Sequence, residues 1–362
     1  RGLFLFNFLG GIIMDTIEIG LKIKDHINLT IQELETMKRE IEGLMSPFGY
    51  NYCNYLSFSS AKKIIIKISY PRFFAGTNAY LITKRSECFQ VQNHFVNNFL
   101  SDILWSNYIE GISLNRVDIP FTYLMETTEE FASYENIYYI FAHVYDRKIE
   151  NARTKAYLDL INKGYETLIY APNGSVGKSY NNRLEVYNQA LNLSEKLDED
   201  MKESIFNTYK DLPQRIRMEV SKRIRLRNLI GIYDFANYDI LGNYFLSYKN
   251  YILENILDFK VIDELYNYWA NILSQKLIAE RNNGKINYAN FIYQNQQIIY
   301  DYEIVRRAFG ISIDNENTRE NAITRVRQVL IQYENTHNII LMDVYGTLKK
   351  IEAQIKTTYL LD

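Results

Sequence analysis

The sequence predicts an α+β protein: an antiparallel sheet with helices on one face, followed by a mostly helical C-terminal region. The strand-like segments alternate apolar and polar residues, as Asp15 to Ile23 does, and alternation is typical of a sheet with one covered face. Buried parallel strands would be apolar throughout. Helical segments separate these strands, whereas beyond about Ile232 only helical spacing is found. The length of 362 residues agrees with two domains.

The first third of the chain begins with the strand at Asp15 to Ile23. A capping box of Thr30 and Glu33 then starts a helix that we expect to run to about Met45. Three further elements follow: a β-branched strand within Lys62 to Asn78 that is broken by Pro71 and Gly76, a helix from about Phe89 to Asn107, and a strand at Arg116 to Phe121.

The middle of the chain contains one ambiguous segment, Ser133 to Val144, which fits a strand or a helix. After it we expect a strand at Glu166 to Tyr170, a turn at Pro172 to Gly174, a strand at Arg183 to Asn188, a helix at Leu191 to Thr208 and a strand at Ile216 to Ile224. The C-terminal helices are expected at Tyr244 to Lys276, Asn290 to Phe309 and Thr318 to Leu360, with breaks near Asn282 to Gly284 and at Gly310.

Composition limits the partners and the compartment. The formal net charge is −2, so a nucleic-acid partner would have to meet a local basic patch and not the whole molecule. The two cysteines, Cys53 and Cys88, are too few for a disulfide framework or a zinc site, which fits a reduced, cytoplasmic setting.

The apolar residues 1–13 are too short to span a bilayer and lack a signal-peptide cleavage site. We expect them to be an upstream leader outside the fold, with Met14 as the start of the protein. Residues 14–232 would then form a catalytic domain, and residues 233–362 a helical region. No membrane partner is expected.

Three predicted strands share a basic–apolar–acidic triplet: Arg116-Val117-Asp118, Arg183-Leu184-Glu185 and Arg217-Met218-Glu219. The alternation sends each acid to the face opposite the apolar residue. If the strands are neighbours, Asp118, Glu185 and Glu219 converge, and converging carboxylates suit Mg²⁺ or Mn²⁺. Ordinary cross-strand ion pairs on a solvated face are the alternative interpretation.

Tyr187 shares the polar face of its strand with Arg183 and Glu185. A tyrosine beside a carboxylate is what a metal-assisted tyrosine nucleophile requires. It is also an ordinary strand residue, since the chain contains 31 tyrosines.

The densest cationic run lies on and after the last strand. It consists of Arg215, Arg217, Lys222, Arg223, Arg225 and Arg227. The segment Gly174 to Ser179 ends like a P-loop, but Pro172 stands where that motif needs a glycine and supplies no amide N–H. We therefore interpret it as a hairpin loop that carries Lys178. The four histidines have no metal-ligand spacing.

Four motifs occur in an order that resembles the rolling-circle replication initiators of phages and plasmids, of the filamentous-phage gene-II type. They are SYPRFFAGTN, RVDIPF, YNQALNL and RMEVSKRIRLRN. The resemblance extends from Met14 to about Ile232.

The resemblance implies a nicking-and-rejoining domain on an antiparallel sheet. Tyr187 would attack a DNA phosphodiester, keep the 5′-phosphate and release a 3′-OH. Asp118 and Glu219 match acids of the family, and with Glu185 they would hold Mg²⁺ or Mn²⁺. The DNA partner would be single-stranded or hairpin origin DNA, contacted by Arg217, Lys222, Arg223, Arg225 and Arg227, and a host helicase is a further expected partner.

The third motif departs from the family pattern at two positions. Its lysine is Gln189 and its glutamate is Asn192. Lys178 or Arg183 would then supply the cation that lowers the pKa of the phenol. The competing hypothesis is a non-catalytic DNA-binding replication or regulatory protein on the same fold.

Overall fold

The computed structural model describes residues 14–125, 134–148, 152–157, 167–172, 182–194, 196–224, 228–295, 301–337 and 343–359. Two compact units divide the chain. One contains the described residues up to Met125, those of 151–252 and those from Gln354 onward, and we call it the sheet unit. The other contains those of 126–150 and 253–353, and we call it the helical unit. The expected boundary at 232/233 therefore lies about twenty residues before the one that the contacts define.

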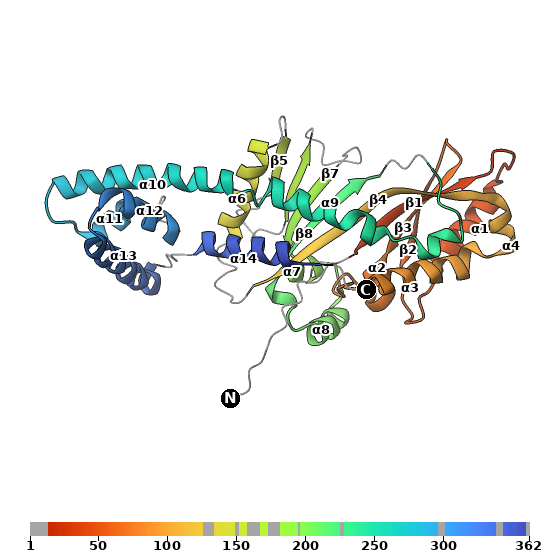
Figure 1. The fold of residues 1–362 in the computed structure, drawn as a ribbon. Coiled ribbons are helices and arrows are strands. Elements are labelled where there is room, and N and C mark those ends of the chain that lie inside the picture. The colour runs from red at the N-terminus through yellow and green to blue at the C-terminus, as the bar shows by residue number, and fades with distance from the viewer. Residues whose placement is uncertain are drawn as a thin grey trace. The chain divides into compact units, whose positions relative to one another are not determined.

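The sheet unit is built on one antiparallel sheet of eight strands in the order β2-β3-β1-β4-β8-β7-β6-β5 (Figure 1). This confirms the predicted α+β class. In chain order the strands are β1 (Thr16–Ile23), β2 (Cys53–Ser59), β3 (Lys63–Ser69), β4 (Ile109–Leu124), β5 (Ala152–Tyr157), β6 (Thr167–Pro172), β7 (Asn182–Asn188) and β8 (Arg215–Arg223). β2 and β5 lie outside the segments that were predicted as strands.

The alternating strands place one apolar face under helices. In β1, Ile17, Ile19 and Leu21 are fully buried, as their spacing predicts. Three helices cover this face: α1 (Ile31–Glu42), α3 (Arg85–Phe95) and α9 (Ile240–Asn255). The predicted capping box starts α1, and Phe245 of α9 stacks on Phe121 of β4 with ring centroids 5.8 Å apart.

Short helices line one end of the other, polar face. They are α2 (Tyr70–Ala75), α7 (Gln189–Ser194) and α8 (Glu199–Thr208). A small apolar cluster, which includes Ala79, Leu193 and Leu212, packs α7 and α8 together. The helix expected at 191–208 is thus two helices, because Asp198 caps a new helix at α8 with its side chain.

Other boundaries also differ from the prediction. The helix expected at 89–107 is α3, a π-helical turn at Val96–Leu100 and α4 (Ile103–Tyr108). The ambiguous segment is α6 (Tyr134–Lys148). Residues 1–13 and the loop at 174–179 lie outside the described residues.

The helical unit contains α6 and five helices of the C-terminal region. These are α10 (Phe259–Asn282), α11 (Tyr288–Asn295), α12 (Tyr302–Ser312), α13 (Glu316–His337) and most of α14 (Val344–Thr357). The helix expected at Tyr244 to Lys276 is divided into α9 and α10. Asp258 starts α10 as its N-cap, because its side chain accepts a hydrogen bond from Lys260 N at 2.9 Å. Within the described ranges, no helix has the length and apolar character needed to cross a membrane.

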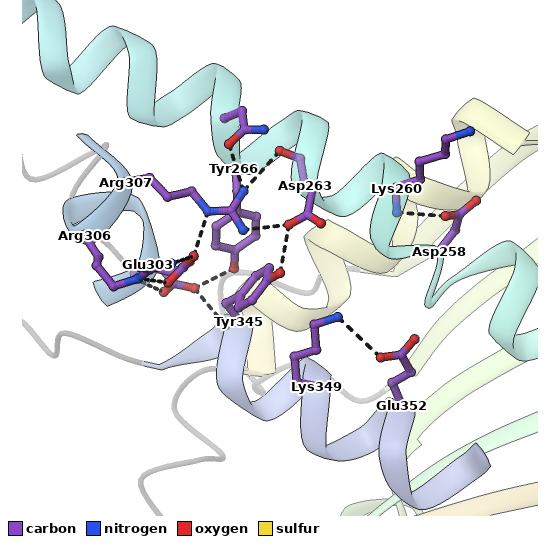
Figure 2. A network of polar contacts seen from close by, with 12 residues as sticks. Asp258, Lys260, Asp263, Tyr266, Glu303, Arg306, Arg307, Tyr345, Lys349 and Glu352 are labelled. Atoms are coloured by element: carbon purple, nitrogen blue, oxygen red, sulfur yellow. Dashed lines mark hydrogen bonds and ion pairs between the residues drawn. The ribbon is translucent and has the colours of Figure 1, made fainter. Parts of the chain in front are cut away.

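A buried polar network ties three helices of this unit together (Figure 2). Asp301, which is fully buried, accepts hydrogen bonds from Tyr266 Oη at 2.5 Å, Glu303 N at 2.8 Å and Tyr345 N at 3.0 Å. Burial raises the pKa of Asp301 to about 6. Arg307 bridges Asp263 and Glu303, at 2.6 and 2.7 Å.

Replacing Asp301 by alanine should destabilise the helical unit by about 3 kcal/mol, because three buried donors lose their acceptor. Native-state hydrogen exchange should become faster in α10 and α12 and stay unchanged in β1. The matched control is Asp314→Ala at an exposed position. Equal exchange in the two variants would contradict this role of Asp301.

Candidate active site on the polar face of the sheet

The polar face gathers charged side chains on β4, β8 and β7, which are neighbours in the sheet. Across β7 and β8, Glu185 lies opposite Glu219 and Tyr187 lies opposite Arg217. Across β4 and β8, Asp118 lies opposite Ser221, next to Glu219 on the same face. The register therefore brings the acids of all three triplets to adjacent positions on this face.

Tyr187 forms a direct hydrogen bond with Glu219. Its phenol Oη donates to Glu219 Oε2 at 3.1 Å, and the residue is only 4% exposed. Burial and the Glu219 carboxylate raise the pKa of Tyr187 well above its usual value and outweigh the opposing effect of Arg217. The phenol is therefore protonated at rest, and its pKa is not lowered overall, although Arg217 acts in that direction.

Arg217 lies under this pair with no exposed surface. One guanidinium nitrogen lies 2.8 Å from Asp15 Oδ2, and another lies 3.7 Å from Glu219 Oε2. A third donates to the backbone carbonyl of Asn78 at 3.2 Å. A buried cation needs such compensation, so the two carboxylates and the carbonyl hold Arg217 in place.

Glu219 has the chemistry of a proton acceptor. Burial is the largest cause that raises its pKa to about 7, the nearby Asp15 and Asp118 carboxylates add to this, and Arg217 opposes them. Burial also raises the pKa of Asp118, whose carboxylate pairs with Arg116 at 2.9 Å. A carboxylate with a pKa near neutrality, bonded to a phenol, is suited to general-base catalysis.

The Tyr187–Glu219 pair lies at a polar pocket of about 250 Å³. One wall is the motif SYPRFFAGTN, residues 69–78. Its residues Ser69, Arg72, Gly76, Thr77 and Asn78 line the pocket. The opposite wall is the end of α7 and the turn after it, with Asn192, Leu193 and Lys196. Asp15 and Lys67 also line it. The first, third and fourth motifs therefore meet at one pocket.

The expected metal ligands meet only in part. Glu185 and Glu219 line the pocket, whereas Asp118 does not. Glu185 pairs with Arg183 and Glu219 with Arg217. Within the ranges that the structure describes, no group of three or more Asp, Glu, His or Cys side chains is arranged to hold a metal ion. Three carboxylates line the pocket, Asp15, Glu185 and Glu219, and only the last two belong to the expected set.

The predicted basic patch does not form one surface. Arg217 is buried beside Glu219, whereas Lys222 shares the apolar face of β8 and lies over Tyr248 of α9 at 4.6 Å from the ring centroid. Arg223 is exposed at the end of β8. Lys178, Arg225 and Arg227 lie outside the described residues.

Gln189, which replaces the motif lysine, has a structural role. It is fully buried, its side-chain amide donates to Asn78 O at 2.6 Å, and its carbonyl accepts from Arg215 at 3.5 Å. Arg215 also donates to Ala79 O at 2.7 Å. Together with Arg217, these side chains fasten the wall at Asn78 and Ala79 to β8 and α7. Arg183 does not take the role of the lysine, because it pairs with Glu185.

Two pocket residues, Asp15 and Lys196, were not predicted to belong to the site. Asp15 immediately precedes the alternating strand β1, which is the only sequence signal for it. Lys196 follows α7 by two residues, and no motif marks it.

A scan against protein-family models and a search of curated proteins gave no match to this chain.

Replacing Arg217 by methionine should lower the free energy of unfolding by about 3–5 kcal/mol, because Asp15 and Glu219 lose their buried counter-charge. The matched control is Arg183→Met on the neighbouring strand, which removes a partly exposed pair and should cost less than about 1 kcal/mol. Urea denaturation measures both. A loss for Arg217→Met no larger than that of the control would contradict the anchoring role.

Proposed function

We propose that this protein is a rolling-circle replication initiator that nicks and rejoins origin DNA through a covalent 5′-phosphotyrosine on Tyr187. The observation that carries the proposal is the hydrogen bond from Tyr187 Oη to Glu219 at a polar, cation-lined pocket. A nucleophile bonded to a base, with the base oriented by a third group, is the arrangement that nucleophilic catalysis needs, and Arg217 is that third group. The order of motifs supports the same reaction.

The nicking step follows from these contacts. Glu219 accepts the phenolic proton as Tyr187 Oη attacks the phosphorus, so that a new O–P bond forms. The bond from phosphorus to the 3′ oxygen breaks, and that oxygen takes a proton from water to become the 3′-OH. Glu219 then releases its proton to water. The phosphotyrosine retains the energy of the phosphodiester, so attack by a 3′-OH rejoins the strand without ATP.

The high pKa of Tyr187 makes the base necessary. Free phenolate is scarce at neutral pH in this site, and the proton must therefore leave during the attack. Glu219 is a stronger base than an exposed glutamate because its pKa is raised. Arg217 stays beside both groups and offsets the negative charge as it moves from the phenol to the phosphate.

Mg²⁺ or Mn²⁺ is part of the proposal as a cofactor. Glu185 and Glu219, which line the pocket together with Asp15, would hold it, and a bound ion would polarise the phosphate. Origin DNA, single-stranded or in a hairpin, is the proposed substrate. For the helical unit, origin DNA and a host helicase are the two partners we propose.

Two observations favour a second function, a DNA-binding replication protein without catalysis. The raised pKa of Tyr187 and the structural role of Gln189 are both what a chain that has lost its nucleophile would show. That protein would bind the same DNA and leave it intact in the presence of Mn²⁺.

Replacing Tyr187 by phenylalanine removes the nucleophile and keeps the ring that fills the site. Nicking of the supercoiled plasmid or phage DNA that encodes the chain should fall by at least about 1,000-fold, and no covalent protein–DNA adduct should form. Gel electrophoresis measures both. Tyr233→Phe, at a tyrosine that is 66% exposed, is the matched control and should nick normally. Normal nicking by Tyr187→Phe would disprove the mechanism.

The rate of nicking should depend on the protonation of Glu219. Since its pKa is raised to about 7, the carboxylate is the main form above pH 7, and the rate should fall about tenfold per pH unit well below that value. Glu219→Gln cannot accept the proton, so its residual rate should be low and should not show this dependence. An unchanged pH profile in Glu219→Gln would assign the dependence to another group.

A further inference from the structure

We infer that Lys196, together with Lys67 and Arg72, forms the binding site for the scissile phosphate, and that Lys196 supplies the charge that Gln189 does not. This inference rests on the proposed function, because it names the residues that hold the DNA phosphodiester at Tyr187. It gives the pocket a ligand class, a phosphate with one negative charge between two sugars.

Three separate elements bring these cations to one place. Lys67 is on β3, Arg72 is in α2 and Lys196 follows α7, and all three line the pocket that Tyr187 and Glu219 also line. Arg217 and Gln189 both donate to the carbonyl of Asn78 and so hold this wall against β8 and α7, which brings residues far apart in sequence together. The convergence is therefore a property of the fold and not of a local charged run.

Among the described residues, none of the three cations forms an ion pair within 4.0 Å, although Glu219 acts on Lys196 and Asp118 on Lys67 from farther away. In the described part of the chain, neither Lys67 nor Arg72 has an acidic partner within 4.0 Å. Lys196 Nζ donates to the neutral side-chain oxygen of Asn192 at 2.8 Å. Burial lowers the pKa of Lys196 and outweighs the opposite effect of the Glu219 carboxylate. An anion in the pocket would relieve this penalty.

The acids of the pocket pair with other cations than these three. Asp15 and Glu219 share Arg217, and Glu185 pairs with Arg183. The lining of the pocket therefore has three acids, which pair with Arg217 and Arg183 outside the lining, and three cations, Lys67, Arg72 and Lys196. Three cations that have no acidic partner among the described residues suit a phosphodiester, which carries one negative charge and gains more as the nucleophile attacks.

Asn192 explains why the charge comes from position 196. The family pattern places a lysine two residues after the tyrosine and a glutamate three residues later. Here the first position is buried against Asn78, and Asn192, at the second, accepts from Lys196. The turn after α7 returns the lysine to the pocket beside Tyr187. A neutral asparagine orients Lys196 and leaves its charge in place, whereas a glutamate at this position would neutralise that charge.

The test measures binding and nicking separately. Binding uses fluorescence anisotropy with a fluorescein-labelled oligo(dT) 20-mer, in the Tyr187→Phe background so that no strand is cut. Lys196→Ala should weaken binding roughly tenfold, the loss of one hydrogen bond to a charged group. The slope of log affinity against log salt should decrease by about 0.7, which corresponds to one phosphate contact.

Nicking is measured on the supercoiled DNA with Tyr187 intact. Lys196→Ala should lower kcat by about 100-fold, as for loss of one group that stabilises developing charge. Lys196→Arg should restore most of the rate. The matched control is Lys202→Ala, a surface lysine of α8 that pairs with Glu199 outside the pocket and should change neither measurement. Circular dichroism checks that each variant folds.

The outcomes separate this inference from the proposed function. If Lys196→Ala binds the oligonucleotide and nicks like the wild type, the phosphate site is wrong, even where Tyr187-dependent nicking proves the function. If the wild type never nicks but the salt slope still depends on Lys196, the phosphate site stands and the catalytic function fails. A change of equal size in Lys202→Ala would also overturn the inference, because it would show a non-specific charge effect.

Discussion

The buried guanidinium of Arg217 is the interaction on which the polar half of this fold depends. It joins β8 to Asp15 at the start of β1 and to the carbonyl of Asn78, the end of the wall that α2 begins. Arg215 makes similar contacts: it donates to the backbone carbonyl of Ala79 and to the side chain of Gln189 in α7. A charged group with no exposed surface is costly unless every partner stays in place, so this network fixes the pocket in one geometry.

The same network also sets the chemistry. Arg217 alone would lower the pKa of both Tyr187 and Glu219, but burial and the Asp15 carboxylate have the opposite effect and are larger. The result is a neutral phenol bonded to a carboxylate that titrates near pH 7.

Sequence periodicity predicted the sheet well because alternation reports directly on which face of a strand is covered. It placed Asp118, Glu185 and Glu219 on one face, and the strand order made them neighbours. Alternation does not report what covers the polar face. Arg217 was therefore expected at the DNA surface although it is buried under a loop, and Lys222 was grouped with it although the same alternation puts Lys222 with Val220 on the helical face.

Gln189, two residues after Tyr187, shows the limit of matching motifs by spacing. A motif records where a charge stands in sequence, whereas catalysis needs the charge at a point in space. Gln189 occupies the expected position but bonds to Asn78, and the turn after α7 brings Lys196, seven residues later, to the pocket. The departure that argued most strongly against an active site is thus compatible with one. The relevant question for such chains is which cation lines the pocket, not which residue fills the motif.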